Sequence, residues 1–106
     1  MAVPADRPPS PPTLRVSGNR LVDEFGRPFR LAGVNRSGTE YACAQGWGIF
    51  DGAADRSFVR TIKSWGANSV RIGLNEHCWL GINGVSEEWG GAAYRQAVTS
   101  FVDLLH

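Results

Sequence analysis

The chain has 106 residues, of which 42% are apolar, and a formal net charge of +1, as expected for one small globular domain. Its eleven basic residues are scattered among ten acidic ones, so we expect no nucleic-acid partner, and without an apolar run near ~20 residues we expect no membrane span. The first residues also lack the basic start and apolar core of a secretory signal peptide.

Residues 1–12 contain five of the six prolines and almost no large apolar side chains. This is the composition of an extended, semi-rigid tail or linker. Residues 13–106 are therefore expected to form the folded part of the chain.

The folded part is predicted to begin with a β-hairpin. Residues 14–22 read as two short strands around the pair Gly18-Asn19, a two-residue turn that is a strong local signal for a hairpin. A further turn at 24–26 leads to a strand predicted over 29–35, which Pro28 begins rather than interrupts.

The segment 36–55 is too long for a simple connection, and it holds Glu40, Tyr41 and Trp47. Long loops that carry aromatic residues are often functional, so we interpret this one as functional rather than disordered. Asp55 is a suitable N-cap for a helix predicted to run to about Trp65, and the apolar spacing predicts that Trp65 packs in the core.

A buried strand is predicted over 69–74, followed by a loop over 75–91 and a helix from about residue 92 to the end. Arg71 lies within this strand, where an arginine is costly unless a carboxylate meets it. The order strand, helix, strand, helix predicts a parallel pair with a right-handed crossover, in the α/β class. Two strands cannot build such a core, so the sequence resembles the opening of something larger.

Three runs of the sequence occur in an order and spacing that are typical of one enzyme family: LRVSGNRLVDEFGRPFRLAGVNRSGTEY, GIFDG and IKSWGANSVRIGLNEHCWLG. They resemble the N-terminal quarter to third of glycoside hydrolase family 5 cellulases, especially the bacterial endoglucanase-like members. The resemblance implies a TIM (β/α)8 barrel that hydrolyses β-1,4-glucans with retention of configuration. A full barrel takes ~250 residues, so this chain would supply the N-terminal hairpin and about two of the eight β/α units.

The resemblance also implies a role for Arg71, which would point into the barrel and hydrogen-bond the nucleophile carboxylate. The alternative is an arginine paired with Glu40 or Glu76 of its own chain. Retaining hydrolysis uses two carboxyl groups ~5–5.5 Å apart, one as nucleophile and one as acid and then base. Both would lie beyond residue 106, so the chain alone is expected to be inactive, with the remainder of the barrel as its required partner.

The pair Asn75-Glu76 is not read as the family's general acid/base. Family members carry that group in an Asn-Glu-Pro sequence after the fourth strand, whereas this pair follows the second strand and precedes His77. Glu76 is therefore interpreted as a loop carboxylate, and His77 and His106 are not assigned to the family's later histidines.

Several residues after the two strands are implied to contact a β-glucan polysaccharide or oligosaccharide in the full-length enzyme, because aromatic planes stack on sugar rings and polar groups bond hydroxyls. They are Glu40, Tyr41, Trp47, Asn75 and Trp79. The family also implies secretion. No cofactor or metal is expected: the glycines 46, 48 and 52 do not have dinucleotide-binding spacing, and no His or Cys cluster has metal-ligand spacing.

The two cysteines, Cys43 and Cys78, are consistent either with a disulfide or with two ordinary thiols. Both follow adjacent predicted strands at the same edge, so a disulfide between the two loops is geometrically reasonable. Two other functions stay open. One is a carbohydrate-binding module using Trp47, Trp79 and Trp89, although two predicted helices are unusual for such modules. The other is a small α/β interaction domain.

Overall fold

The computed structural model describes residues 11–106, so the tail predicted over 1–12 lies almost entirely outside the described residues. The chain divides into two compact units, a hairpin unit that ends at Leu31 and a larger unit over Ala32–Leu105. Residues 11–106 contain two two-stranded sheets and no closed barrel. Within the same residues, no helix has the length and apolar character needed to cross a membrane.

The hairpin unit pairs β1 (Arg15–Ser17) with β2 (Arg20–Val22) in antiparallel register, which confirms the predicted hairpin. Gly18 begins the connecting turn with φ +62°, a value that favours glycine. A second turn follows at Asp23. Burial alone would raise the pKa of Asp23, but hydrogen bonds from Arg27 and Phe25 lower it below its ordinary value.

The larger unit is built on two parallel strands, β3 (Gly33–Arg36) and β4 (Ser69–Ile72). The parallel pairing confirms the prediction. The predicted strand limits were wrong: 29–32 lies outside β3, and β4 ends at Ile72 rather than residue 74. The two strands are paired only over Gly33–Arg36 and Ser69–Ile72. Just before the pairing begins, the backbone N–H of Ala32 donates to a side chain, Asn68 Oδ1 at 2.8 Å, instead of to a backbone carbonyl.

Two longer helices confirm the predicted helical segments. The first, α2 (Arg56–Ser64), begins at Asp55, whose side chain accepts from the Phe58 N–H at 3.1 Å. The second is α4 (Ala92–Leu105). The prediction that Trp65 packs in the core was wrong, because α2 ends before this residue and Trp65 is 68% exposed. The prediction of a buried strand over 69–74 was also wrong, because β4 has no fully buried residue and its Arg71 is exposed.

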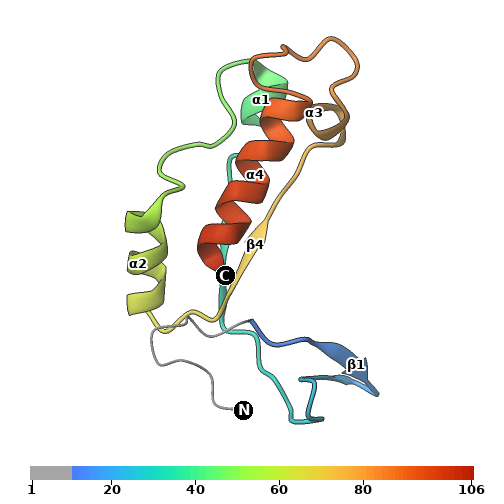
Figure 1. Ribbon diagram of the computed structural model, residues 1–106, viewed down its shortest axis with the longest axis vertical. Coiled ribbons are helices and arrows are strands. Elements are labelled where there is room, and N and C mark those ends of the chain that lie inside the picture. The colour runs from blue at the N-terminus through green and yellow to red at the C-terminus, as the bar shows by residue number, and fades with distance from the viewer. Residues whose placement is uncertain (1–10) are drawn as a thin grey trace, which may run out of the picture. The chain divides into compact units, whose positions relative to one another are not determined.

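Two short helices form inside the segments predicted as loops. They are α1 (Ala42–Gln45) and α3 (Glu76–Leu80), and Figure 1 shows both near the start of α4. The Asn75 side chain caps α3 by accepting from the Cys78 N–H at 3.2 Å. Both helices end at a glycine with positive φ, Gly46 and Gly81 respectively.

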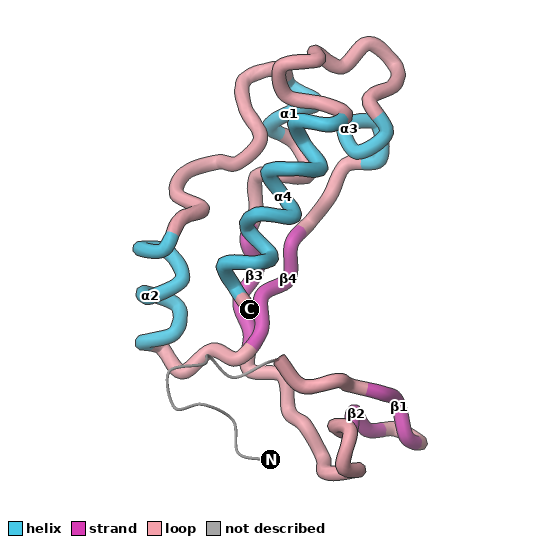
Figure 2. Tube along the Cα trace, viewed as in Figure 1, coloured by secondary structure: helices cyan, strands magenta, loops and turns pink. Residues whose placement is uncertain are grey.

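The α4 helix lies along the β3–β4 pair (Figures 1 and 2), and its buried residues are Tyr94, Val98 and Phe101. Phe101 meets Phe50 and Phe58 edge to face, with ring centroids 5.4 and 5.6 Å apart. This aromatic cluster fixes the position of α4 relative to α2.

Arg36, at the end of β3, identifies the face of the sheet that the helices cover. Its guanidinium stacks over the rings of Phe50 and Phe58, and its Nη2 donates to the Ala53 carbonyl at 2.9 Å. Because strand side chains alternate, Arg36 shares this face with Val34, whereas Asn35 lies on the opposite, helix-free face. Arg71 is register-paired with Asn35 and lies on that same helix-free face.

Candidate functional site

A hollow of about 400 Å³ lies at the carboxyl end of β3 and β4. In parallel α/β proteins this edge is where ligand and catalytic groups gather. Its lining brings together two arginines, a carboxylate and an amide from two segments far apart in the sequence: Asn35, Arg36, Ser37, Glu40, Arg71, Gly73 and Leu74. It is the candidate functional site of the described chain.

Arg71 places a positive charge in this hollow. Its side chain is exposed on the helix-free face of β4. Among residues 11–106 the only ion pair joins Arg27 to Asp23, so neither Glu40 nor Glu76 pairs with Arg71. Because Arg71 is exposed, it does not carry the cost of a buried charge, and within residues 11–106 no carboxylate pairs with it.

Glu40 lies on the loop that follows β3, and its side chain lines the same hollow. Both of its carboxylate oxygens accept from the Gly38 N–H at 3.2 Å. The side chain packs over Gly73, where a Cβ would lie only 2.7 Å from Glu40 Oε2. A side chain at position 73 would therefore push the Glu40 carboxylate, the flexible end of that side chain, away from its place beside the end of β4.

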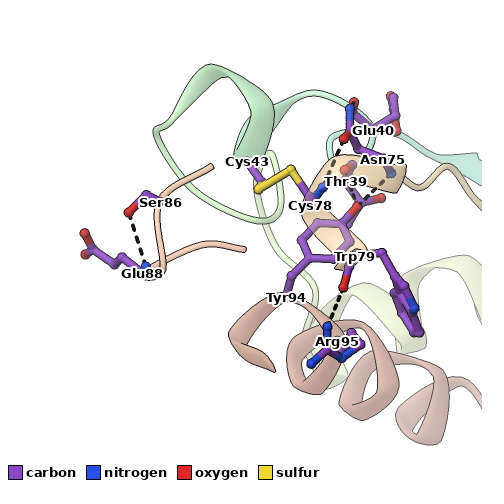
Figure 3. Close-up of a disulfide and its surroundings, with 10 residues drawn as sticks. All are labelled: Thr39, Glu40, Cys43, Asn75, Cys78, Trp79, Ser86, Glu88, Tyr94 and Arg95. Carbon is purple, nitrogen blue, oxygen red and sulfur yellow. Dashed lines mark hydrogen bonds between the residues drawn. A yellow bond between two sulfur atoms is a disulfide. The ribbon is translucent and has the colours of Figure 1, made fainter. Parts of the chain in front are cut away.

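The loops after β3 and β4 are joined by a network around the Tyr94 hydroxyl (Figure 3). This hydroxyl donates to the Thr39 carbonyl at 2.5 Å and accepts from the Asn75 N–H at 3.1 Å. The Asn75 side-chain amide donates to the Glu40 carbonyl at 3.2 Å, and the Thr39 hydroxyl donates to the Gly73 carbonyl. These bonds fix the backbone that carries Glu40 relative to the end of β4.

A disulfide between Cys43 and Cys78 ties α1 to α3 beside this network (Figure 3). The Cα atoms are 6.2 Å apart, and the two cysteines are 1% and 0% exposed. Tyr94 and Val98 of α4 pack against them and complete a buried cluster. The disulfide and α4 therefore hold the two loops that form the site.

The buried Tyr94 should make stability sensitive to alkaline pH. Burial raises the pKa of Tyr94 above its ordinary 10.0, the charge of Glu40 adds to this, and the Asn75 N–H opposes it. Above pH 10.0 the unfolded chain loses the tyrosine proton while the folded chain retains it, so the free energy of unfolding falls as pH rises through this range.

We expect Tyr94→Phe to lower the free energy of unfolding at neutral pH by about 1–3 kcal/mol, because the Thr39 carbonyl and Asn75 N–H lose a buried partner. In the variant, the free energy of unfolding should also fall less steeply as the pH rises above 10.0. Urea unfolding at neutral and alkaline pH measures both effects. Tyr41→Phe is the control for the loss at neutral pH, which should be smaller because the Tyr41 hydroxyl bonds Asp51 at an exposed position. It should also reduce the alkaline fall in stability, because the pKa of Tyr41 is raised too. An alkaline decline unchanged by Tyr94→Phe would contradict the assignment.

Tyr41 and Trp47 lie on the loop between β3 and α2, near the hollow in sequence but not among its lining residues. The Tyr41 hydroxyl donates to Asp51 Oδ2 at 2.5 Å, and this bond raises the pKa of Tyr41. Trp47 is 47% exposed, with its ring centroid 5.9 Å from that of Tyr41. Its indole N–H donates to Gln45 Oε1 at 2.7 Å, which holds the ring in place although the residue is exposed.

The other tryptophans considered as sugar contacts are placed differently. Trp79 and Trp89 are partly buried and pack against the cluster of Cys43, Cys78, Tyr94 and Val98. The Trp79 ring meets Tyr94 edge to face at 6.5 Å, and its carbonyl accepts from Arg95. The Asn75 side chain already makes hydrogen bonds within the chain, because it caps α3 and donates to the Glu40 carbonyl. The structure therefore gathers Glu40 and Arg71 in one hollow and places Trp79 and Asn75 in supporting positions.

Sequence reasoning did not identify Thr39, Gly73 or the Tyr94 hydroxyl as part of this site. Tyr94 was assigned only to the apolar face of the last helix. A tyrosine at a buried helical position is a usable signal, because its hydroxyl then needs a polar partner. Nothing in the local sequence of Thr39 or Gly73 shows that the Thr39 hydroxyl meets the Gly73 carbonyl across the sheet edge.

No family model, curated protein or solved structure matches this chain. The resemblance to glycoside hydrolase family 5 thus rests on the three sequence runs alone. It stays a prediction from sequence.

Proposed function

We propose that this chain is the N-terminal part of a TIM-barrel hydrolase of the family 5 cellulase type, which cleaves β-1,4-glucans with retention of configuration. The observation that carries the proposal is the position of Arg71. It lies on the helix-free face of a parallel strand, at the edge where such enzymes hold their catalytic groups, and has no carboxylate partner within residues 11–106.

The proposed role of Arg71 is to orient the nucleophile, not to react. A guanidinium presents a planar fork of donors that holds a carboxylate ionised and in a fixed plane. The nucleophile and the acid/base would both come from outside this sequence. Glu76 is not a candidate for either role, because it is exposed in the first turn of α3, where a negative charge is stabilised by the helix dipole.

The open sheet supports the same proposal. The helix-free face of β3 and β4 exposes Asn35 and Arg71, and the described chain has no third strand beside either one. Parallel sheets are normally covered on both faces, as they are when a barrel closes. A carbohydrate-binding module is less well supported, because Trp79 and Trp89 are partly buried and pack against the core cluster.

The test is a chimera in which residues 13–106 replace the equivalent segment of a characterised family 5 endoglucanase. We expect it to hydrolyse carboxymethylcellulose, and we expect Arg71→Ala to reduce turnover on the order of 10²-fold, the cost of misplacing a reacting group. Glu76→Gln is the matched control and should retain activity. Circular dichroism verifies that each variant folds.

Two results would overturn the proposal. One is an Arg71→Ala chimera as active as its parent, which would remove the role assigned to the arginine. The other is hydrolysis by the 106-residue chain itself, which would place both catalytic carboxylates within it.

A further inference from the structure

The loop between α3 and α4 contains a tight turn at Asn83-Gly84. Asn83 has φ +58° and Gly84 has φ +80°, and the Val85 N–H approaches the Ile82 carbonyl at 3.5 Å. Two consecutive residues with positive φ are typical of a type I′ turn, for which Asn-Gly is the preferred pair. We propose that Asn83 is a site of spontaneous deamidation, with the backbone nitrogen of Gly84 as the nucleophile.

The sequence singles out Asn83 among five asparagines. The other four, Asn19, Asn35, Asn68 and Asn75, precede Arg, Arg, Ser and Glu respectively. A side chain on the following residue hinders the approach of its backbone nitrogen to the asparagine carboxamide. Glycine has no such side chain, so the ring-forming step is least hindered at position 83.

The structure leaves the reacting atoms accessible. Asn83 and Gly84 are both exposed, and a Cβ built on Gly84 would meet no atom within 4 Å. Within the described chain, the Gly84 N–H donates to no hydrogen-bond acceptor. Among residues 11–106, the one hydrogen-bonding contact of the Asn83 side chain is that of Nδ2 with His77 Nε2 at 3.0 Å. In contrast, Asn75 has both side-chain polar atoms bonded within the fold.

The reaction needs only water as a co-reactant. The Gly84 nitrogen gives its proton to solvent base and bonds to Asn83 Cγ. The Cγ–Nδ2 bond breaks, and the amide nitrogen takes a proton from solvent and leaves as ammonia. Water then opens the five-membered imide at one of its two carbonyl carbons. Opening at the side-chain carbonyl gives aspartate, whereas opening at the backbone carbonyl gives isoaspartate, in which the main chain runs through the side-chain carbon.

Either product changes the loop. The neutral amide becomes a carboxylate, which brings the formal net charge of +1 to zero in a loop that already carries Glu87 and Glu88. Isoaspartate also lengthens the main chain within the turn. Val85, directly after the turn, lines a hollow of about 390 Å³ at the start of α4, so the change would alter the wall of that hollow.

The test is peptide mapping by mass spectrometry after incubation of the folded chain in mildly alkaline buffer, beside a sample unfolded in urea. We expect the mass change of amide to acid to accumulate at position 83 in both samples, several-fold faster than at any other asparagine. Gly84→Ala should slow it several-fold, and Asn83→Gln should abolish it. Asp51-Gly52 can form the same type of imide, but its hydrolysis gives aspartate or isoaspartate of unchanged mass. A gain in mass therefore reports on asparagine and not on Asp51.

The proposal is overturned if the folded chain keeps the Asn83 amide while the unfolded chain loses it, because the turn would then protect the residue. It is equally overturned if another asparagine is modified first, or if Gly84→Ala reacts as fast as the parent.

Discussion

Replacing Cys43 and Cys78 together by alanine is expected to lower the free energy of unfolding by roughly 3–4 kcal/mol, because the disulfide removes the closure entropy of a long loop from the unfolded chain. The bond spans 35 residues and is buried, so solvent reductants should reach it only after the surrounding cluster opens. Urea unfolding of the parent and the double variant under oxidising conditions measures the difference.

The control is the parent chain unfolded with and without a thiol reductant, since reduction should reproduce most of the loss without changing the sequence. A thiol assay on the native chain should detect no free cysteine. Two titratable thiols in the native chain, or a double variant within about 0.5 kcal/mol of the parent, would contradict this account.

Phe101→Ala should be as damaging, with an expected loss of about 3–5 kcal/mol, because it removes a large side chain that is 1% exposed and leaves a cavity. Its ring meets Phe50 and Phe58 edge to face, so the variant also loses the contacts that hold α4 against α2. Urea unfolding followed by far-ultraviolet circular dichroism measures the change.

The matched control is Phe25→Ala, the same substitution at a residue that is 73% exposed, for which we expect a change within about 0.5 kcal/mol. If Phe101→Ala leaves no folded baseline, Phe101→Leu should still give a measurable loss, because it keeps most of the buried volume. Equal effects of the two alanine substitutions would show that Phe101 is not part of a packed core.

The elements that could be predicted from sequence are those with a local signal. Gly18-Asn19 between apolar residues predicted the hairpin, and Asp55 before an apolar stripe predicted the start of α2; both were confirmed. The parallel pairing of β3 and β4 was also predicted, since a crossover helix between two strands leaves few alternatives.

The short helices α1 and α3 could not be predicted, because they have only four and five residues and depend on contacts made elsewhere. A disulfide joins them, and Tyr94 packs behind them from α4. The prediction for Trp65 was wrong although its local signal was clear. Its spacing fits the apolar stripe of α2, but the helix ends at Ser64 and leaves Trp65 exposed at its C-cap.

The candidate site was partly predictable. The alternation of side chains along a strand placed Arg71 on the face opposite the apolar residues. Glu40 was expected on the loop at the carboxyl end of the neighbouring strand. Periodicity did not predict how Glu40 is held. This depends on the space left by glycine at position 73 and on the Thr39 hydroxyl, which donates to the Gly73 carbonyl across the edge. Asn75 and Trp79 carry the residue types of a sugar site, yet their local contacts are with the chain itself.

The disulfide has a further consequence for the order of folding. The ladder pairs Gly33 with Ser69, and the disulfide joins Cys43 to Cys78 across 35 residues, so both contacts close loops of nearly the same length. In a reduced chain the two strands must find each other through a slow non-local search. In an oxidised chain the disulfide already holds together the segments that follow the two strands, so the strands search for each other over a shorter effective stretch of chain. The disulfide therefore speeds the encounter of β3 and β4 as well as stabilising the folded chain.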